Sequence, residues 1–234
     1  MSTDRSMPSG DPAGVGCVTF RPAGRVVGGV VVCHEIWGVT EPLLVAARRL
    51  ASAGFLVAVP DFYAVRDGSP TADYARASRW RDGLDIAGIR RVLDDAIGWL
   101  RAEGVPGVGV LGYSMGGAIA LWAAATLDID AAVTFYGGGL VDPYWPDMPA
   151  GVVLARRLSV PWLGFYGASD SLTPPDALRR LRDALDGGHE RGKVVVFDGL
   201  EHGFALDATD PRHAPGEAAE AWRDALAFLG GSRD

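Results

Sequence analysis

The chain has 234 residues, 48% of them hydrophobic, and a formal net charge of −7. This length and composition are typical of one globular domain with a sizeable core, and the acidic balance argues against a nucleic-acid-binding footprint. No apolar run reaches the length of a membrane span, so we expect no membrane partner.

The first 14 residues are polar and rich in Pro, Gly and Ser. They lack the apolar core of a signal peptide, so we expect a flexible N-terminal segment and a cytoplasmic protein. Residues 15–234 are expected to form a single domain. Cys17 and Cys33 match neither a disulfide framework nor a zinc pattern, and each is expected to be a buried thiol. The four histidines lack metal-ligand spacing, so we expect no metal, and we expect no cofactor.

The first elements alternate between strand and helix patterns. A short strand is expected over 15–21, and the continuous apolar run 28–33 predicts a strand covered on both faces. Thr40 then provides an N-cap, with Pro42 in the first turn of a helix that ends at Gly54. The apolar stripe of this helix is formed by Leu43, Ala46, Ala47 and Leu50.

The middle of the chain is less regular at first. A buried strand is expected over 55–59, followed by a polar stretch over 64–80 that we expect to be loop with some helix. Apolar residues at helical spacing then predict an amphipathic helix over 84–101. The next strand leads to Ser114, and a helix of small residues follows to about Leu127.

The last third continues the alternation. Strands are expected over 131–136, 160–165 and 193–197, and helices from Pro174 to about Leu185 and over 216–229. Residues 140–155 have no clear pattern and are expected to be an irregular loop. The whole order predicts an α/β protein with a mostly parallel, doubly wound sheet flanked by helices.

Four chemically useful residues each follow a different predicted strand: Glu35, Ser114, Asp170 and His202. In a parallel sheet the carboxyl ends of the strands meet at one edge, where ligands bind. We therefore expect these four side chains to lie close together.

Residues 112–116 form a G-x-S-x-G sequence between a strand and a helix. This is the context of a nucleophile elbow, in which the serine sits on a tight turn and the flanking glycines avoid a collision. The helix that begins after Ser114 directs N–H groups and the positive end of its dipole at that position. The N–H of Met115 is the expected first donor to a substrate oxyanion.

Ser114, Asp170 and His202 occur in the chain order nucleophile, acid, histidine. This order is that of the α/β-hydrolases, in which the histidine takes the serine proton and the acid orients the imidazole. Each residue has rivals: the rival nucleophile lacks the elbow glycine spacing, and the rivals of the acid and the histidine lie away from the expected strand ends. The rivals are Cys33 for the nucleophile, Asp176 for the acid, and His189 and His213 for the histidine.

Gly107, Gly109 and Gly112 also spell G-x-G-x-x-G, a dinucleotide-binding fingerprint. This alternative predicts a dinucleotide-dependent oxidoreductase. Its glycines fall inside the expected strand rather than after it, which argues against this interpretation.

Several of these motifs together resemble the dienelactone hydrolases, over about residues 28–229. The motifs are His34–Gly38 (HEIWG), Pro60–Tyr63 (PDFY), Gly112–Gly117 (GYSMGG), Tyr136–Gly137 (YG), Gly167–Asp170 (GASD) and Glu201–Phe204 (EHGF). The resemblance implies an α/β-hydrolase fold and hydrolysis of a lactone or another carboxylic ester. It also implies that Glu35 lies beside the nucleophile and that the Ile36 N–H is the second oxyanion donor.

Two positions depart from the family pattern. The best-known members carry a cysteine nucleophile where this chain has Ser114, so Glu35 either sets the charge state of the site or braces the turn as a hydrogen-bonded acid. The members that cleave dienelactones carry an arginine four residues after the histidine, where this chain has Leu206. This favours a plainer or more apolar ester, although an arginine near 76–81 remains a candidate cation.

The expected walls of the substrate pocket are Trp37, Tyr63, Arg81, Tyr136, Tyr144 and Trp145, with Arg76 and Arg79 as further candidate cations. The leading hypothesis is a serine hydrolase of small esters or lactones, a small-molecule enzyme. A thioesterase or acyltransferase on the same triad, and a binding module without turnover, remain open. The sequence leaves open whether the protein is a monomer or a homodimer, and whether residues 140–155 form a lid.

Overall fold

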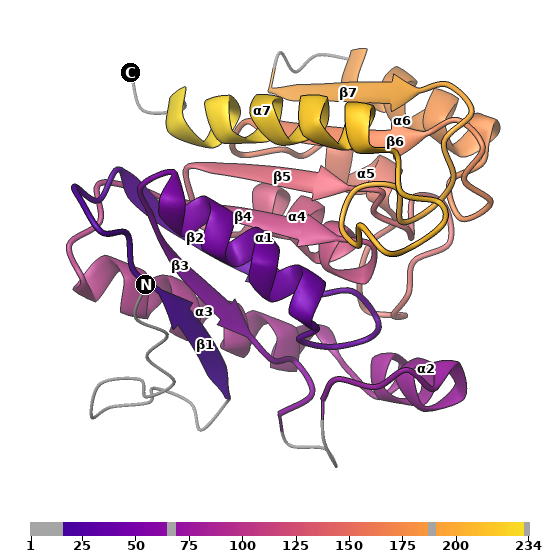
Figure 1. Ribbon diagram of the computed structural model, residues 1–234. Helices are drawn as coiled ribbons and strands as arrows, with labels where there is room; N and C mark the ends of the chain where they lie inside the picture. The colour runs from indigo at the N-terminus through magenta and orange to yellow at the C-terminus, as the bar shows by residue number, and fades with distance from the viewer. Residues whose placement is uncertain (1–15, 65–68, 187–190, 232–234) are drawn as a thin grey trace.

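Figure 1 shows the computed structural model, which describes residues 16–64, 69–186 and 191–231. These residues build one seven-stranded sheet in the order β1-β3-β2-β4-β5-β6-β7. The edge strand β1 runs antiparallel to β3, and all the other pairs are parallel. The strands are β1 (Cys17–Phe20), β2 (Gly28–Cys33), β3 (Phe55–Pro60), β4 (Val108–Tyr113), β5 (Ala131–Phe135), β6 (Trp162–Gly167) and β7 (Gly192–Phe197). The predicted doubly wound α/β architecture is confirmed.

Helices cover both faces of the sheet (Figure 1). One face packs against α1 (Glu41–Ser52) and α7 (Pro215–Gly231), whose buried side chains share one core cluster with alternate residues of the strands. The other face packs against a second core cluster formed with α3 (Ile86–Ala102), α4 (Met115–Thr126), α5 (Gly151–Ala155) and α6 (Pro175–Asp186). The helix α2 (Tyr74–Asp82) lies off the edge of the sheet, near the carboxyl ends of the strands. Both cores hold the strand ends at fixed positions, and these ends carry the site.

Most of the predicted elements are present, with two differences along the chain. The expected loop over 140–155 ends in the short helix α5, which hydrogen bonds from Gly151 N–H to Gly139 O and from Val152 N–H to Leu140 O fix in place. Its two β-branched valines obscure a helical pattern in the sequence. Strand β6 begins and ends two residues later than expected, because its pairing with β7 continues to Gly167.

One local expectation was wrong, and another is confirmed only in position. Cys17 is half-buried rather than buried, because β1 is an edge strand with only one strand neighbour. Thr40 occupies the N-cap position of α1, but its side chain makes no capping hydrogen bond; its backbone carbonyl accepts a hydrogen bond from Leu44 N–H. The expected flexible segment, residues 1–14, lies outside the described residues.

The opposite edge of the sheet is β7, with the sequence GKVVVF. Its valines are half-buried, and its exposed residue Lys193 is the only lysine of the chain. Among the helices of the described residues, none combines the length and the apolar character needed to cross a membrane.

Candidate active site

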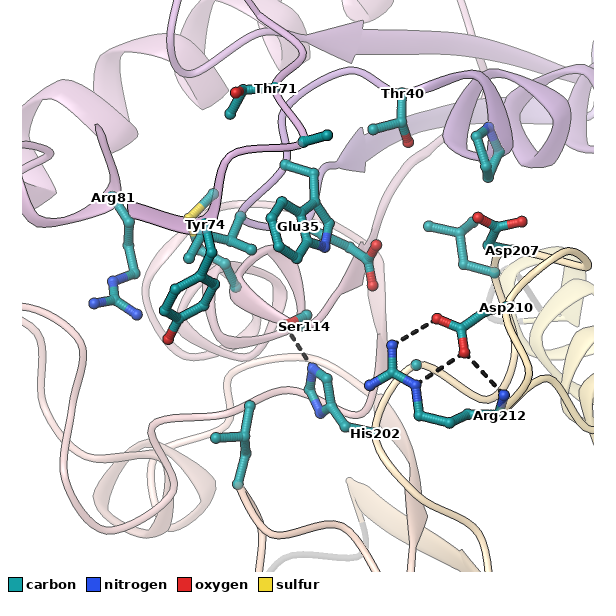
Figure 2. Close-up of a pocket in the computed structure, with 18 of the residues that line it drawn as sticks. Glu35, Thr40, Thr71, Tyr74, Arg81, Ser114, His202, Asp207, Asp210 and Arg212 are labelled. Carbon is teal, nitrogen blue, oxygen red and sulfur yellow. Dashed lines mark hydrogen bonds and ion pairs between the residues drawn. The ribbon is translucent and has the colours of Figure 1, made fainter. Parts of the chain in front are cut away.

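The four strand-end residues come together at the carboxyl edge of the sheet. Glu35 follows β2, Ser114 follows β4, Asp170 follows β6 and His202 follows β7. Glu35, Ser114 and His202 line one pocket (Figure 2), and Asp170 is buried behind His202. The order of the strands in the sheet therefore brings these four residues close together, as their positions directly after the strands predicted.

Ser114 occupies a strained turn between β4 and α4. Its φ of 52° and ψ of −114° are outside the region that most residues adopt, as expected for a nucleophile elbow. The backbone is held on both sides, because Ser114 N–H donates to Phe135 O at 3.0 Å and Ser114 O accepts from Gly117 N–H at 2.9 Å. This network fixes the serine at the start of α4, where the N-terminal N–H groups face it.

The two elbow glycines are required by close backbone packing. A Cβ atom on Gly112 would lie 1.9 Å from Gly116 O, and a Cβ atom on Gly116 would lie 2.2 Å from Cys33 O. Both obstacles are backbone atoms of the central strands and helix, so neither has room to move aside. The turn is therefore pressed against the end of β2, next to Glu35 and Ile36.

We expect Gly116→Ala to destabilise the fold by more than about 3 kcal/mol, because overpacking against backbone cannot be relieved by a rotamer change. The measurement is the free energy of unfolding in urea. The matched control is Gly98→Ala in α3, where a Cβ atom meets nothing within 4 Å. Alanine there is expected to stabilise by about 0.5–1 kcal/mol. Equal unfolding free energies for the two variants would contradict the packing argument.

A hydrogen-bonded chain links the three triad candidates. The distance from Ser114 Oγ to His202 Nε2 is 2.8 Å, and that from His202 Nδ1 to Asp170 Oδ2 is 2.7 Å. Asp170 is only 1% exposed, and its second oxygen, Oδ1, accepts from Leu172 N–H at 2.8 Å. Two hydrogen bonds thus hold the buried carboxylate, and the one to His202 also fixes the orientation of the imidazole ring.

Two backbone N–H groups are available beside the serine. Met115 and Ile36 both line the pocket, the first at the start of α4 and the second in the turn after β2. Within the described part of the chain, neither N–H takes part in a hydrogen bond. The turn that carries Ile36 is braced by the buried His34, whose Nδ1 lies 2.6 Å from Glu35 O and whose Nε2 accepts from Phe62 N–H.

Glu35 is half-buried at the pocket wall and lies in a charged neighbourhood. Loss of hydration raises the pKa of its carboxyl above the ordinary value of 4.5, while the nearby His202, the Tyr136 hydroxyl and Arg212 act in the opposite direction. The Tyr136 hydroxyl is buried and close to Glu35, although it lies outside regular hydrogen-bond geometry. Glu35 is therefore an acid that the folded protein keeps protonated to higher pH than the unfolded chain does.

This raised pKa predicts a stability difference that depends on pH. When the pKa of a group is higher in the folded protein than in the unfolded chain, protonation of that group stabilises the fold. This contribution is complete below the unfolded-state pKa and is lost as the pH rises through the folded-state pKa. Glu35→Gln removes this loss, so its Tm is expected to exceed that of the wild type by an amount that grows as the pH rises above the ordinary carboxyl pKa of 4.5. Differential scanning calorimetry measures it, with the exposed Glu220→Gln on α7 as the control whose difference stays flat.

A lower Tm of Glu35→Gln at alkaline pH would contradict this prediction. If Glu35→Gln melts below the wild type at pH 8, Glu35 acts as an ionised brace of the turn.

The rival residues lie away from this arrangement. Cys33 is fully buried in β2, and burial raises the pKa of its thiol, so it is no nucleophile for a substrate. Asp176 pairs with Arg179 on the exposed surface of α6. The backbone N–H of His213 donates to Asp210 O in a turn beyond the pocket wall, and His189 lies outside the described residues.

Three of the six expected pocket walls line the pocket: Trp37, Arg81 and Tyr144. The other three are corrected to core residues, with the exposed area of each at most 1%. Tyr63 packs on His34 and directs its hydroxyl to Met115 Sδ, Tyr136 packs edge-on against His202, and Trp145 donates from Nε1 to Arg81 O. Arg76 and Arg79 are exposed on α2, and neither lines the pocket.

The pocket has a volume of about 630 Å³ and contains residues that the sequence analysis missed. Tyr74 is the first residue of α2, and Asp207, Asp210 and Arg212 come from the loop before α7. Figure 2 shows Tyr74 on one side of the pocket and the loop residues on the other. Neither segment has a motif. The only available signal was the short distance of the loop from His202 along the chain.

The alternative sites lack a structural basis. Gly109 and Gly112 lie inside β4, and a Cβ atom on Gly109 would meet Leu229 of α7. A dinucleotide fingerprint needs its glycines in the turn after the strand, so no phosphate-binding loop forms there. In the described residues, no group of three or more His, Cys, Asp or Glu side chains is arranged to hold a metal ion.

Comparisons of the sequence and of the structure with known proteins point to the same family. The sequence model of the dienelactone hydrolase family matches residues 15–232. An Escherichia coli protein named "Putative carboxymethylenebutenolidase" is 30% identical over 207 residues, which are 86% of this chain and 75% of that protein. The crystal structure of a "Putative Dienelactone Hydrolase" from Klebsiella pneumoniae has a TM-score of 0.81, with 27% identity and 91% of both chains covered.

A second solved structure is that of a dienelactone hydrolase-like promiscuous phosphotriesterase from metagenomic libraries. It is 25% identical, has a TM-score of 0.74, and the match covers 99% of this chain and 96% of that one. The sheet order, the flanking helices and the strand-to-helix turn at Ser114 define the α/β-hydrolase fold. Within that class, the chain belongs to the dienelactone hydrolase family, a family of hydrolases.

Proposed function

We propose that this protein is a serine hydrolase that cleaves carboxylic esters or lactones through an acyl-enzyme intermediate. The observation that carries the proposal is the continuous hydrogen-bonded chain from Ser114 Oγ through the His202 imidazole to the buried Asp170, at the wall of the pocket. Such a chain activates a hydroxyl that is otherwise a poor nucleophile at neutral pH.

In the proposed reaction, His202 Nε2 accepts the serine proton as Ser114 Oγ bonds to the substrate carbonyl carbon. The carbonyl oxygen takes the negative charge and is held by the N–H groups of Met115 and Ile36. His202 then gives the proton to the leaving alcohol oxygen as the C–O bond breaks. A water molecule repeats the sequence on the acyl-enzyme, and Asp170 stabilises the imidazolium in both halves.

Family membership supports the reaction class. The name of the Escherichia coli relative specifies a butenolide, which is a lactone, and the metagenomic relative is named a phosphotriesterase. Attack by an activated nucleophile at a carbonyl or phosphoryl centre is common to these reactions. In this chain Leu206 supplies an apolar side chain to the pocket wall, which favours a less charged substrate than a dienelactone.

The test is intact-mass measurement after incubation with a fluorophosphonate, followed by peptide mapping. One adduct per chain, on Ser114, is expected, and the Ser114→Ala variant is expected to remain unmodified. A folded wild-type protein that forms no adduct on Ser114 would contradict the proposal, because a fluorophosphonate reports an activated serine regardless of the substrate.

A further inference from the structure

Two large apolar side chains that line the pocket are exposed to solvent. The described residues include five large hydrophobic side chains that are exposed, and two of them, Tyr74 at 65% and Leu172 at 53%, line this pocket. Exposed apolar surface that gathers at a concave site marks a place where a ligand is covered. Both side chains are therefore available to an apolar group of a substrate in this pocket.

Tyr74 is held in place rather than free on the surface. Its ring lies against the Trp37 ring, with centroids 6.1 Å apart and planes tilted by 58°. Thr71 N–H donates to Trp37 O at 3.0 Å, and the Asp73 side chain caps α2 by accepting from Arg76 N–H. These contacts tie the start of α2 to the turn after β2, so the two rings form a preorganised aromatic wall, which we call the Trp37–Tyr74 wall.

The charges on the two sides of the pocket differ. Figure 2 shows Tyr74 and Arg81 on one side, and Asp207, Asp210 and Arg212 on the other. Arg212 donates to Asp210 through Nε at 2.9 Å and Nη2 at 2.5 Å, and this pairing holds the pKa of Asp210 at about 2. The guanidinium is thus paired with an acid that stays ionised at neutral pH, and Asp207 lies on the same side of the pocket.

The second arginine of the pocket is also engaged. Arg81 donates to Asp82 Oδ1 through Nε and Nη2, and its guanidinium carbon lies 5.3 Å from the centre of the Tyr144 ring. Both pocket arginines in the described residues therefore already contact an acid. The balance of charge around the pocket disfavours an additional carboxylate on the substrate.

We infer that the substrates are uncharged esters with an aromatic group, which packs against the Trp37–Tyr74 wall while the ester carbonyl lies at Ser114. The pocket volume of about 630 Å³ accommodates such a molecule, since an engineered cavity of about 150 Å³ already holds benzene. Leu172 contributes a further apolar surface at the same pocket. The inference rests on the proposed function and specifies the substrate class of that same site.

The experiment compares kcat/KM for three acetate esters: 4-acetoxyphenylacetamide, 4-acetoxyphenylacetic acid and trifluoroethyl acetate. The first two share an aromatic leaving group and differ in charge, and the third is activated but has no ring. The wild type is expected to favour the amide over the acid. Tyr74→Ala is expected to reduce the ratio of kcat/KM for the amide to that for trifluoroethyl acetate by about tenfold, the scale of an apolar pocket contact.

Two further variants separate packing from general damage. Tyr74→Phe keeps the ring and is expected to retain the wild-type ratio. Val45→Ala removes another exposed apolar side chain, which lies on α1 outside the pocket, and is expected to leave the ratio unchanged. Preference for the acid over the amide, or an unchanged ratio in Tyr74→Ala, would overturn the inference while ester hydrolysis itself stands. A wild type that cleaves none of the three esters would overturn the proposed function and this inference with it.

Discussion

Replacing Ser114 with alanine is expected to lower kcat on an activated aryl acetate by about a millionfold. The variant keeps the pocket and the two backbone N–H groups but has no atom to bond to the carbonyl carbon. In the proposed mechanism Ser114, His202 and Asp170 act as a unit, so the two remaining residues cannot compensate for the lost nucleophile. The residual rate comes from binding and from the oxyanion donors alone. Steady-state kinetics with active-site titration of the wild type measures the difference.

The control for this prediction is Ser52→Ala. The Ser52 hydroxyl is exposed at the end of α1 and donates to Arg48 O, remote from the chemistry. This variant is expected to keep wild-type kcat. Turnover by Ser114→Ala within tenfold of the wild type would rule out Ser114 as the nucleophile, provided that contaminating esterase has been excluded.

If Asp170 is the proposed acid, Asp170→Asn is expected to lower kcat by about ten-thousandfold, the loss that the same change causes in a known Ser-His-Asp protease. The amide fits the space of the carboxylate and still accepts from Leu172 N–H, so the fold is preserved. Its NH₂ group, however, donates toward His202 Nδ1 and favours the tautomer with the proton on Nε2. That tautomer cannot accept the serine proton, and a neutral amide does not stabilise the imidazolium.

The matched control is Asp176→Asn, which alters the rival acid on the exposed surface of α6. Its kcat is expected to remain within about twofold of the wild type, because an exposed ion pair contributes little. A loss of activity in Asp176→Asn that equals the loss in Asp170→Asn would contradict the assignment of the acid.

The fold was predictable where burial makes the sequence pattern simple. Residues 28–33 and 55–59 are continuous apolar runs because helices cover both faces of a parallel sheet, and both were identified as strands. The helix α5 was not, because its five residues span little more than one turn and no amphipathic period develops over that length. The end of β6 was misplaced because the extension is set by pairing with β7, which the local sequence does not encode.

The sequence also predicted which side chains lie together at the candidate site, but not all of the pocket walls. Ser114, Asp170 and His202 were found because parallel strands bring their carboxyl ends together, and chain order then suggests roles. The pocket walls were harder to assign, since an aromatic side chain suits a core and a pocket equally well. Tyr63 and Trp145 are therefore core residues, while Tyr74 lines the pocket from an exposed helix that the sequence left unassigned.

The edge strand β7 has a consequence for the behaviour of the protein at high concentration. Its GKVVVF sequence has high β-propensity, and an edge of this kind is a template for pairing between separate molecules. The exposed ammonium group of Lys193 opposes such pairing, because two copies meeting along this edge would bring like charges together. The only lysine of the chain thus places a positive charge on this edge, and neutralising that charge by acetylation is expected to favour association between molecules along β7.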